Sequence, residues 1–496
     1  MPRLKKYFAP ALLFIILLTV YGLTLAPGLT WANDGADGGD LIAAAATGGV
    51  PHPTGYPLYL ILARGFQFLP VGSLAYRTNL MSAVFMALAA ALTCELVRRE
   101  LEDRSLAGAR LAGLVAGAAF GLSPLAWSQA VITEVYALNA FLVAALLYLS
   151  AIRRTASNPA RVDVWSGLLF GLGLGNHLTL ALMAPVLFAP MVRGRESGRA
   201  VEKSWWRGWQ VDGPVLRRRM AWMAAGLLVY VTLPLRAASH PPLNWGNPVS
   251  WNGFWWLVSA RLYQDEFVLT WPRLVERIRS WAGLLLGQAG LPGLLAGFFG
   301  LTFHSSALRR DTLWIAALAS LFAIFYGTAD SYVYLIPLAM CFAIWIGLGL
   351  AAWMDSAARY RRWGGALIGV LALAYLAALA FQHVPLVDAS HDPRAEQFGE
   401  AVLARAPEGA LIFAKGDGAV FAMWYYRFAL QQRPDLVVVA SDLLHFEWYL
   451  QTLRAAYPDL SLPGPFPWPE SLIAANPARP YCYVQYVQGI DVRCSQ

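Results

Sequence analysis

Long apolar runs separated by short polar segments fill the first 385 residues of the chain. Most of these runs approach or exceed the roughly 20 apolar residues that a helix needs to cross the hydrocarbon core of a bilayer. They lie at Phe8–Leu25, Leu80–Val97, Leu106–Ser123, Val131–Ile152, Met220–Leu235, Ala282–Phe303, Leu313–Thr328, Tyr332–Met354 and Gly364–Phe381. The pattern predicts a polytopic α-helical membrane protein.

Two further apolar segments do not fit a simple span. Val164–Val192 has basic residues near both ends, so we expect it to divide near Gly175-Asn176-His177 into two short helices that turn at the outer side. Non-helical backbone at that depth is tolerated only where it is buried in protein or faces water, so polar Asn176 and His177 predict a cavity. Tyr56–Leu69 is short and bounded by prolines, which is typical of a re-entrant or interfacial segment. In total we expect about eleven spans.

The basic residues mark the predicted orientation. Although the formal net charge is +8, Lys and Arg collect at the ends of the spans rather than on one face, which excludes nucleic acid as the partner. Because loops rich in Lys and Arg stay cytoplasmic, we expect an integral protein of a plasma or inner membrane with its N-terminus inside and its C-terminal domain outside. The membrane domain then covers residues 1–385, with outer loops at 26–56 and 237–280. The first run could instead be a cleaved signal peptide, but it is long for one and lacks a good cleavage site.

The composition of residues 386–496 becomes that of a soluble α/β domain. Three buried strands alternate with two helices, an order that predicts a small parallel sheet. The strands lie at Ala410–Ala414, Leu436–Ala440 and Tyr481–Tyr486, and the helices at Ala419–Gln431 and Leu443–Tyr457.

The chain has four cysteines. Cys94 and Cys341 lie inside predicted spans, where we expect them to pack as small apolar residues. Cys482 and Cys494 lie together near the C-terminus and could form a disulfide if that end is outside the cell. Their spacing does not match a zinc site.

An acidic loop follows the first span. Asp34, Asp37 and Asp40 lie among glycines, and carboxylates near a bilayer are costly unless they are solvated, paired or chemically useful. Such a carboxylate could remove a proton from an acceptor hydroxyl during group transfer, or the loop could be an ordinary acidic turn. Shortly after it, prolines and a glycine fix the backbone around His52 and Tyr56, which could bind a phosphate or a sugar hydroxyl or simply form a structural turn.

Other polar residues at predicted span ends are candidates for the same site. Glu134 begins a span, where an acid is either functional or favoured by the helix dipole. Arg236 ends a span and Arg261 follows it, and guanidinium groups suit a phosphate leaving group through bidentate hydrogen bonds. Arg236 could equally be an arginine that extends to the interface beneath an aromatic belt. Asp417 falls where a strand gives way to a helix, the position of a ligand or of a helix cap.

Several of these stretches together resemble a known membrane family, catalogued as domain of unknown function 2723 and classed as glycosyltransferase family 117, the protein O-mannosyltransferase-like group. The resemblance covers the membrane part well and the C-terminal domain partly. The chain departs from the family pattern at Asp40, where the family usually has Glu. The matching segments are 37–45, 52–59, 127–130, 134–139, 175–179, 235–237, 244–246, 433–435 and 448–449.

The resemblance implies a GT-C-type glycosyltransferase that moves a sugar from a polyprenyl-phosphate donor to an acceptor hydroxyl outside the membrane, with inversion at the anomeric carbon. Asp37 matches the first acid of the motif and is the expected base, with Asp40 orienting the acceptor or tuning the base. We expect the donor to be bound by His52, Tyr56, Glu134, Asn176, His177, Arg236 and Arg261, of which Arg236 and His177 would stabilise the departing phosphate. We expect the acceptor to be a protein Ser or Thr, a glycan or a lipid. No cofactor is required by the sequence, although Mg²⁺ or Mn²⁺ could be held by the acids together with substrate phosphates.

A transporter or flippase of lipid-linked sugars is the alternative. The polar break near Asn176 suits that class as well. However, no inverted repeat stands out in the sequence, and a transporter would not need the C-terminal α/β domain.

Overall fold

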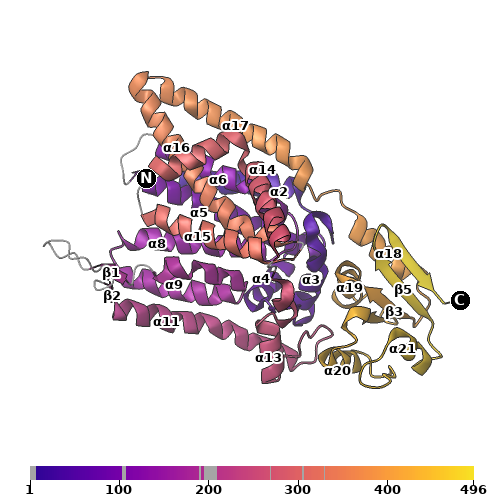
Figure 1. Ribbon diagram of the computed structural model, residues 1–496. Coiled ribbons are helices and arrows are strands. Elements are labelled where there is room, and N and C mark those ends of the chain that lie inside the picture. Colours follow the sequence, from indigo (N-terminus) through magenta and orange to yellow (C-terminus); the bar gives the residue numbers. More distant parts are fainter. Residues whose placement is uncertain are drawn as a thin grey trace.

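The computed structural model describes residues 7–102, 108–188, 192–194, 209–267, 270–303, 307–328 and 330–495. A large helical bundle forms one part of the molecule, and a small α/β unit lies at one end of it, next to α3 (Gly38–Thr47) and α13 (Trp251–Val258) (Figure 1). Some of the basic residues expected to mark orientation, namely Arg3, Lys5, Lys6 and Arg104, fall outside the described residues.

The helical membrane part is confirmed, and each predicted apolar run falls on helix. The helices are α2 (Phe8–Thr24), α5 (Leu74–Glu102), α6 (Ala109–Gly121), α7 (Pro124–Ala130), α8 (Tyr136–Arg153), α9 (Pro159–Leu174), α11 (Gly213–Leu227), α12 (Thr232–Ala237), α14 (Trp271–Phe303), α15 (Ala307–Phe325), α16 (Ile336–Tyr360) and α17 (Gly364–Val387). Within the described residues, 6 helices are long and apolar enough to cross a membrane, or up to 7 if the pair α6 and α7, bent by 66°, is one span.

The expectation of about eleven spans is therefore too high by this criterion. α2 has 17 residues and α9 has 16, so each is short for a crossing. α15 is longer but carries Arg309, Arg310 and Asp311 in its first turns. The predicted division of Val164–Val192 is present, because α9 ends before Gly175 and a second short helical segment covers Leu178–Phe188.

Some basic residues do more than mark orientation. The buried carboxylate of Asp163 on α9 binds Arg153 of α8 at 2.6 Å and Arg219 of α11 at 2.6 Å. A buried carboxylate is tolerated only when it is paired in this way. These arginines therefore join three helices at one end of the bundle.

The α/β unit contains the predicted parallel sheet. Its strand order is β4-β3-β5-β6, and β3 pairs in parallel with both β4 and β5. The sequence did not indicate β6, which pairs antiparallel with β5 and is joined to it by the disulfide Cys482–Cys494. The strands are β3 (Leu411–Lys415), β4 (Val437–Ala440), β5 (Tyr481–Tyr486) and β6 (Ile490–Cys494), and the helices are α18 (Arg394–Arg405), α19 (Asp417–Trp424), α20 (Glu447–Ala456) and α21 (Pro469–Ala475).

The α/β unit is packed against the loop that follows the first helix. A Cβ added to Gly39 in α3 would lie 2.3 Å from the carbonyl oxygen of Phe421 in α19, so the two helices touch backbone to backbone. Next to this contact, Trp245 packs against Phe421 and against Trp448, with ring centroids 6.3 and 5.2 Å apart. The acidic loop is therefore enclosed between the bundle and the α/β unit.

The ends of the first and last helices of the membrane part are also joined. Thr30 and the backbone N–H of Trp31 donate to Asp392 at 2.8 and 3.0 Å. Asn33 donates to the carbonyl of Val387 at 2.9 Å. The acidic loop is thus held by the segment at the end of the last helix of the membrane part.

Candidate active site

Asp40 and His52 form the buried base of the site. Asp40 lies in the first turn of α3 and is fully buried. One of its oxygens, Oδ2, accepts from the backbone N–H of His52 at 2.9 Å and from the ring nitrogen Nδ1 at 2.7 Å. Asp40 therefore fixes the ring of His52.

The hydrogen bonds around His52 indicate an imidazolium. The hydroxyl of Tyr56 donates to the carbonyl of Pro53 at 2.9 Å, because a carbonyl can only accept. The same hydroxyl lies 3.2 Å from Nε2 of His52 and so accepts from it. Nδ1 donates to Asp40, so both ring nitrogens carry protons. Burial alone would lower the pKa of His52, but the charges of Asp37 and Asp40 outweigh it and raise that pKa to about 9.

Asp37 lies on the solvent-exposed side of the Asp40–His52 pair. It ends the 3₁₀ turn η1 (Ala32–Asp37), and its Oδ2 is 3.4 Å from Nε2 of His52. Its side chain is 37% exposed, whereas that of Asp40 is 0% exposed. Enclosure by the protein raises the pKa of Asp37 to about 6; His52 opposes this rise, and the charges of Asp417 and Asp40 add to it. At neutral pH the Asp37 carboxyl is mostly ionised, and this exposed carboxylate lies beside the His52 cation.

Glu134 and Asn176 lie deeper. Glu134 is buried and falls just before α8, so it does not begin that helix as the sequence suggested. Its burial, followed by the charge of Asp37, raises its pKa well above the ordinary value, which favours the neutral acid. Asn176 donates to the carbonyl of Val135 at 3.2 Å and fixes the break after α9 to the segment that carries Glu134.

His177 lies within a group of tyrosines. Its Nδ1 accepts from the backbone N–H of Thr179 at 3.2 Å and so carries no proton. The imidazole is therefore neutral, with its proton on Nε2. The rings of Tyr56, Tyr136 and Tyr334 lie 6.2, 5.6 and 5.7 Å from it, centroid to centroid. His177 is half-buried, and these three rings form part of its surroundings.

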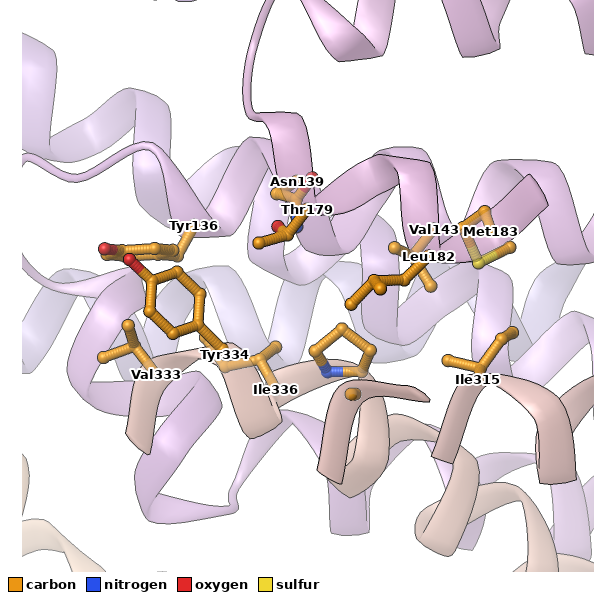
Figure 2. Close-up of a pocket in the computed structure, with 12 residues that line it drawn as sticks. Tyr136, Asn139, Val143, Thr179, Leu182, Met183, Ile315, Val333, Tyr334 and Ile336 are labelled. Carbon is orange, nitrogen blue, oxygen red and sulfur yellow. The ribbon is translucent and has the colours of Figure 1, made fainter. Parts of the chain in front are cut away.

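The cavity predicted near the helix break is small. It lies between the segments that carry Tyr136, Thr179 and Tyr334, and Figure 2 shows the rings of Tyr136 and Tyr334 close together at one end of it. Its volume of about 20 Å³ has room for one water. The break after α9 therefore packs against the site, and the cavity beside it is too small to be a substrate chamber.

The two arginines that the sequence singled out occupy different places. Arg236 in α12 is half-buried and donates to the carbonyl of Gly49 at 3.4 Å, in the segment that leads to His52. Arg261 is exposed at the start of the turn η5 (Arg261–Glu266). The structure thus places Arg236 beside the segment that carries His52, and Arg261 on the surface of the outer loop.

Three further residues lie near the acids, and the sequence offered one of them, Asp417, as a candidate ligand or helix cap. Asp417, at the start of α19, interacts electrostatically with both Asp37 and His52. Tyr263 of η5 and Asp330 before α16 also lie near enough to interact electrostatically with Asp37. Their approach depends on how distant segments pack, and only the strand-to-helix position of Asp417 gave a signal in the sequence.

Asp34 is more than a turn residue. The hydroxyl of Tyr332 donates to its Oδ2 at 2.5 Å, which joins η1 to the segment before α16.

Among the residues that the structure describes, no three His, Cys, Asp or Glu side chains converge as metal ligands. Oxygen ligands supplied by a substrate phosphate are not part of that count, so a role for Mg²⁺ or Mn²⁺ stays a prediction.

Two family models match the chain in order. Residues 37–198 match the Protein O-mannosyl-transferase TMEM260 N-terminal domain, and residues 395–490 match the TMEM260-associated domain 2. The first match begins at Asp37 and contains Asp40, His52 and Glu134. The second covers nearly all of the α/β unit, including Asp417.

Curated relatives extend the likeness along the chain. The Protein O-mannosyl-transferase TMEM260 of Mus musculus is 26% identical over 91% of this chain and 65% of its own length. The Protein O-mannosyl-transferase tmem260 of Dictyostelium discoideum is 23% identical over 91% of this chain and 59% of its own length. The chain therefore spans somewhat less than two thirds of these relatives.

The fold is shared with a solved structure, that of ArnT. The crystal structure of ArnT from Cupriavidus metallidurans bound to undecaprenyl phosphate matches with a TM-score of 0.60 at 14% identity, over 96% of this chain and 92% of that one. This likeness shows the fold, which is GT-C-like, and leaves activity to be argued from residues. The chain is thus a GT-C-like helical membrane protein that is related to the TMEM260 protein O-mannosyl-transferases.

Proposed function

We propose that this protein transfers mannose from a polyprenyl-phosphate carrier to a Ser or Thr hydroxyl of a protein, on the extracytoplasmic side of the membrane. The observation that carries the proposal is the exposed carboxylate of Asp37, held 3.4 Å from an imidazolium at the junction of the bundle and the α/β unit. The likeness to TMEM260 relatives supports the sugar and the class of acceptor. The undecaprenyl phosphate of ArnT, whose fold this chain shares, supports a lipid-phosphate donor.

The proposed step is a direct displacement at the anomeric carbon. Asp37 accepts the proton of the acceptor hydroxyl as its oxygen forms a bond to that carbon. The bond from the anomeric carbon to the phosphate oxygen breaks, and the polyprenyl phosphate leaves with the electron pair. One displacement inverts the configuration. Asp40 does not touch the reacting atoms in this scheme but holds His52, whose positive charge keeps Asp37 ionised.

The decisive experiment uses the purified, full-length protein in lipid vesicles with polyprenyl-phosphate mannose and a Thr-containing protein acceptor. Products analysed by mass spectrometry should contain one added hexose on Ser or Thr, with the α or β linkage opposite to that of the donor. Movement of the intact donor between leaflets without transfer would instead favour a flippase and contradict the proposal.

The pKa values of Asp37 and His52 predict a bell-shaped pH dependence of kcat/KM. Activity should rise with pH through about 6, as Asp37 loses its proton, and fall near 9, as His52 loses its charge. In His52→Gln the charge that lowers the pKa of Asp37 is absent, so the acidic limb should move to higher pH. His391→Gln, at an exposed histidine outside the site, should leave both limbs in place. An acidic limb that stays near pH 6 in His52→Gln would contradict this coupling.

A cleft beside the acidic loop fits the lipid-linked donor. It has a volume of about 490 Å³, and Tyr332, which donates to Asp34, lines its wall. Arg273 lies in the first turn of α14, whereas Trp281 and Leu284 line the cleft further along that helix. A polar end beside an apolar channel suits a phosphate followed by an isoprenoid chain.

Arg273→Ala is therefore expected to raise KM for polyprenyl-phosphate mannose by roughly tenfold, because a hydrogen bond to a charged group contributes about 1.5–3 kcal/mol. Steady-state kinetics with varied donor tests this result. Arg279→Ala, on the same helix but outside the cleft, is the matched control and should leave KM unchanged. If Arg236→Ala raises KM and Arg273→Ala does not, the phosphate binds beside α12 instead.

A further inference from the structure

The α/β unit contains a second cleft that the proposed chemistry does not use. Its volume is about 420 Å³, within the range of ligand-binding pockets. Its wall combines charged, amide and aromatic side chains from three strands and from the segment before α21. The residues that the argument uses are Lys415, Asp442, Trp468, Tyr483, Asp491 and Arg493.

The sheet register explains why these side chains share one face. Lys415 on β3 is opposite Gln485 on β5, and Gln485 is opposite Asp491 on β6. In the neighbouring row, Tyr483 is opposite Arg493. Strands lie about 4.8 Å apart, so a row across three strands extends over about 10 Å, the length of three extended residues.

Only some of the charged side chains that line this cleft form ion pairs. Asp491 binds Arg493 at 2.9 Å and accepts from Gln485 at 2.9 Å. Asp442 accepts from the backbone N–H of Gly416 at 2.9 Å. Lys415 is exposed and forms no ion pair among the residues that the structure describes. The cleft therefore presents one cation, Lys415, and one carboxylate, Asp442, that form no ion pair among the described residues.

Aromatic rings line the same cleft. Trp468 is 74% exposed and Tyr483 is 37% exposed, and Phe413 stacks on Tyr483 with centroids 5.4 Å apart. Exposed large aromatic side chains next to polar groups are enriched where proteins bind other molecules.

The cleft lies where an α/β sheet usually binds its ligand. β3 has β4 on one side and β5 on the other, so the order in which the chain adds strands reverses at β3. In α/β sheets, ligands bind outside the carboxyl ends of the strands at such a point. Lys415 ends β3, and Asp417, two residues later, begins α19 and acts on Asp37. The carboxyl end of β3 thus leads from the cleft toward the segment that acts on Asp37.

We propose that this cleft is the binding site for the acceptor polypeptide, which lies across β3, β5 and β6 in an extended form. An acidic side chain of the acceptor pairs with Lys415, and an apolar side chain packs on Trp468. The identity of the occupant as an acceptor rests on the proposed function. Its chemistry, an extended peptide with acidic and apolar residues, rests on the cleft itself.

The experiment separates binding from transfer. A library of fluorescent twelve-residue peptides, each with one central Thr and randomised flanking residues, is equilibrated with full-length protein in detergent without any donor. Wild-type protein should select acidic residues at one fixed distance from an apolar residue, and acidic peptides should bind about tenfold more tightly than their basic counterparts. Lys415→Glu should reverse this preference, and Trp468→Ala should weaken all selected peptides.

Arg405→Glu is the matched control, because it reverses an exposed charge on α18 away from the cleft and should keep the wild-type preference. An unselective wild type, or an acidic preference that persists in Lys415→Glu, would overturn the acceptor site. Selective binding without mannose transfer from any donor would leave the peptide site in place and contradict the proposed function. A preference for free glycans over peptides would also overturn the inference.

Discussion

Asp37→Asn is expected to abolish most transfer, lowering kcat/KM by about 10²- to 10⁴-fold, which is the usual contribution of a general base. The amide keeps the shape of the side chain but cannot accept the hydroxyl proton. The measurement is the initial rate of mannose transfer in vesicles at pH 7.5, where Asp37 of the wild type is ionised.

Asp34→Asn is the matched control for this change. It makes the same chemical substitution three residues away, at a carboxylate that accepts a hydrogen bond from Tyr332. It should keep activity within a few-fold of wild type. Donor binding should persist in Asp37→Asn, and transfer at the wild-type rate would exclude Asp37 as the base.

Gly39→Ala should have the second largest effect. The added Cβ would lie 2.3 Å from the carbonyl oxygen of Phe421, a backbone atom that cannot rotate away, so α19 must move off α3. Overpacking of this kind costs about 1–3 kcal/mol. We expect the connector at residues 388–393 to be cut faster by protease and transfer to fall at least tenfold, because Asp417 moves with α19.

Gly65→Ala controls for the change of a helical glycine. No atom lies within 4 Å of a Cβ at Gly65, and both substitutions gain the same helix propensity of about 1 kcal/mol. Gly65→Ala should therefore match wild type in both assays. Equal protease sensitivity of the two variants would show that the close contact at Gly39 does not hold the α/β unit in place.

The parts of the site that are close in the sequence could be predicted from it. Asp37, Asp40 and His52 lie within 16 residues of one another, and the rigid turn after His52 makes their meeting local. The sequence could not say which acid is buried, because that depends on the contact of α3 with Phe421. Tyr263 and Asp417 reach the site only through the packing of an outer loop and a separate domain.

The fold was predictable to a similar degree. Hydropathy located the helices, but the count of spans failed where charged residues shorten the apolar stretch of a helix, as in α15. The parallel strands were visible as buried apolar runs. Ile490–Cys494 alternates apolar with charged residues after a glycine and was missed, because only its pairing with β5 makes it a strand.

The hydrogen bonds between the two ends of the membrane part have a consequence for biosynthesis. Thr30 and Asp392 are 362 positions apart, and α19 begins still later. A ribosome that adds about 5–20 residues per second needs roughly 20–80 s to make the intervening chain. Throughout that time the acidic loop has already emerged but lacks Asp392, Phe421 and Asp417. A nascent chain is therefore inactive until α19 has been made, and a product truncated before α19 cannot form the finished site.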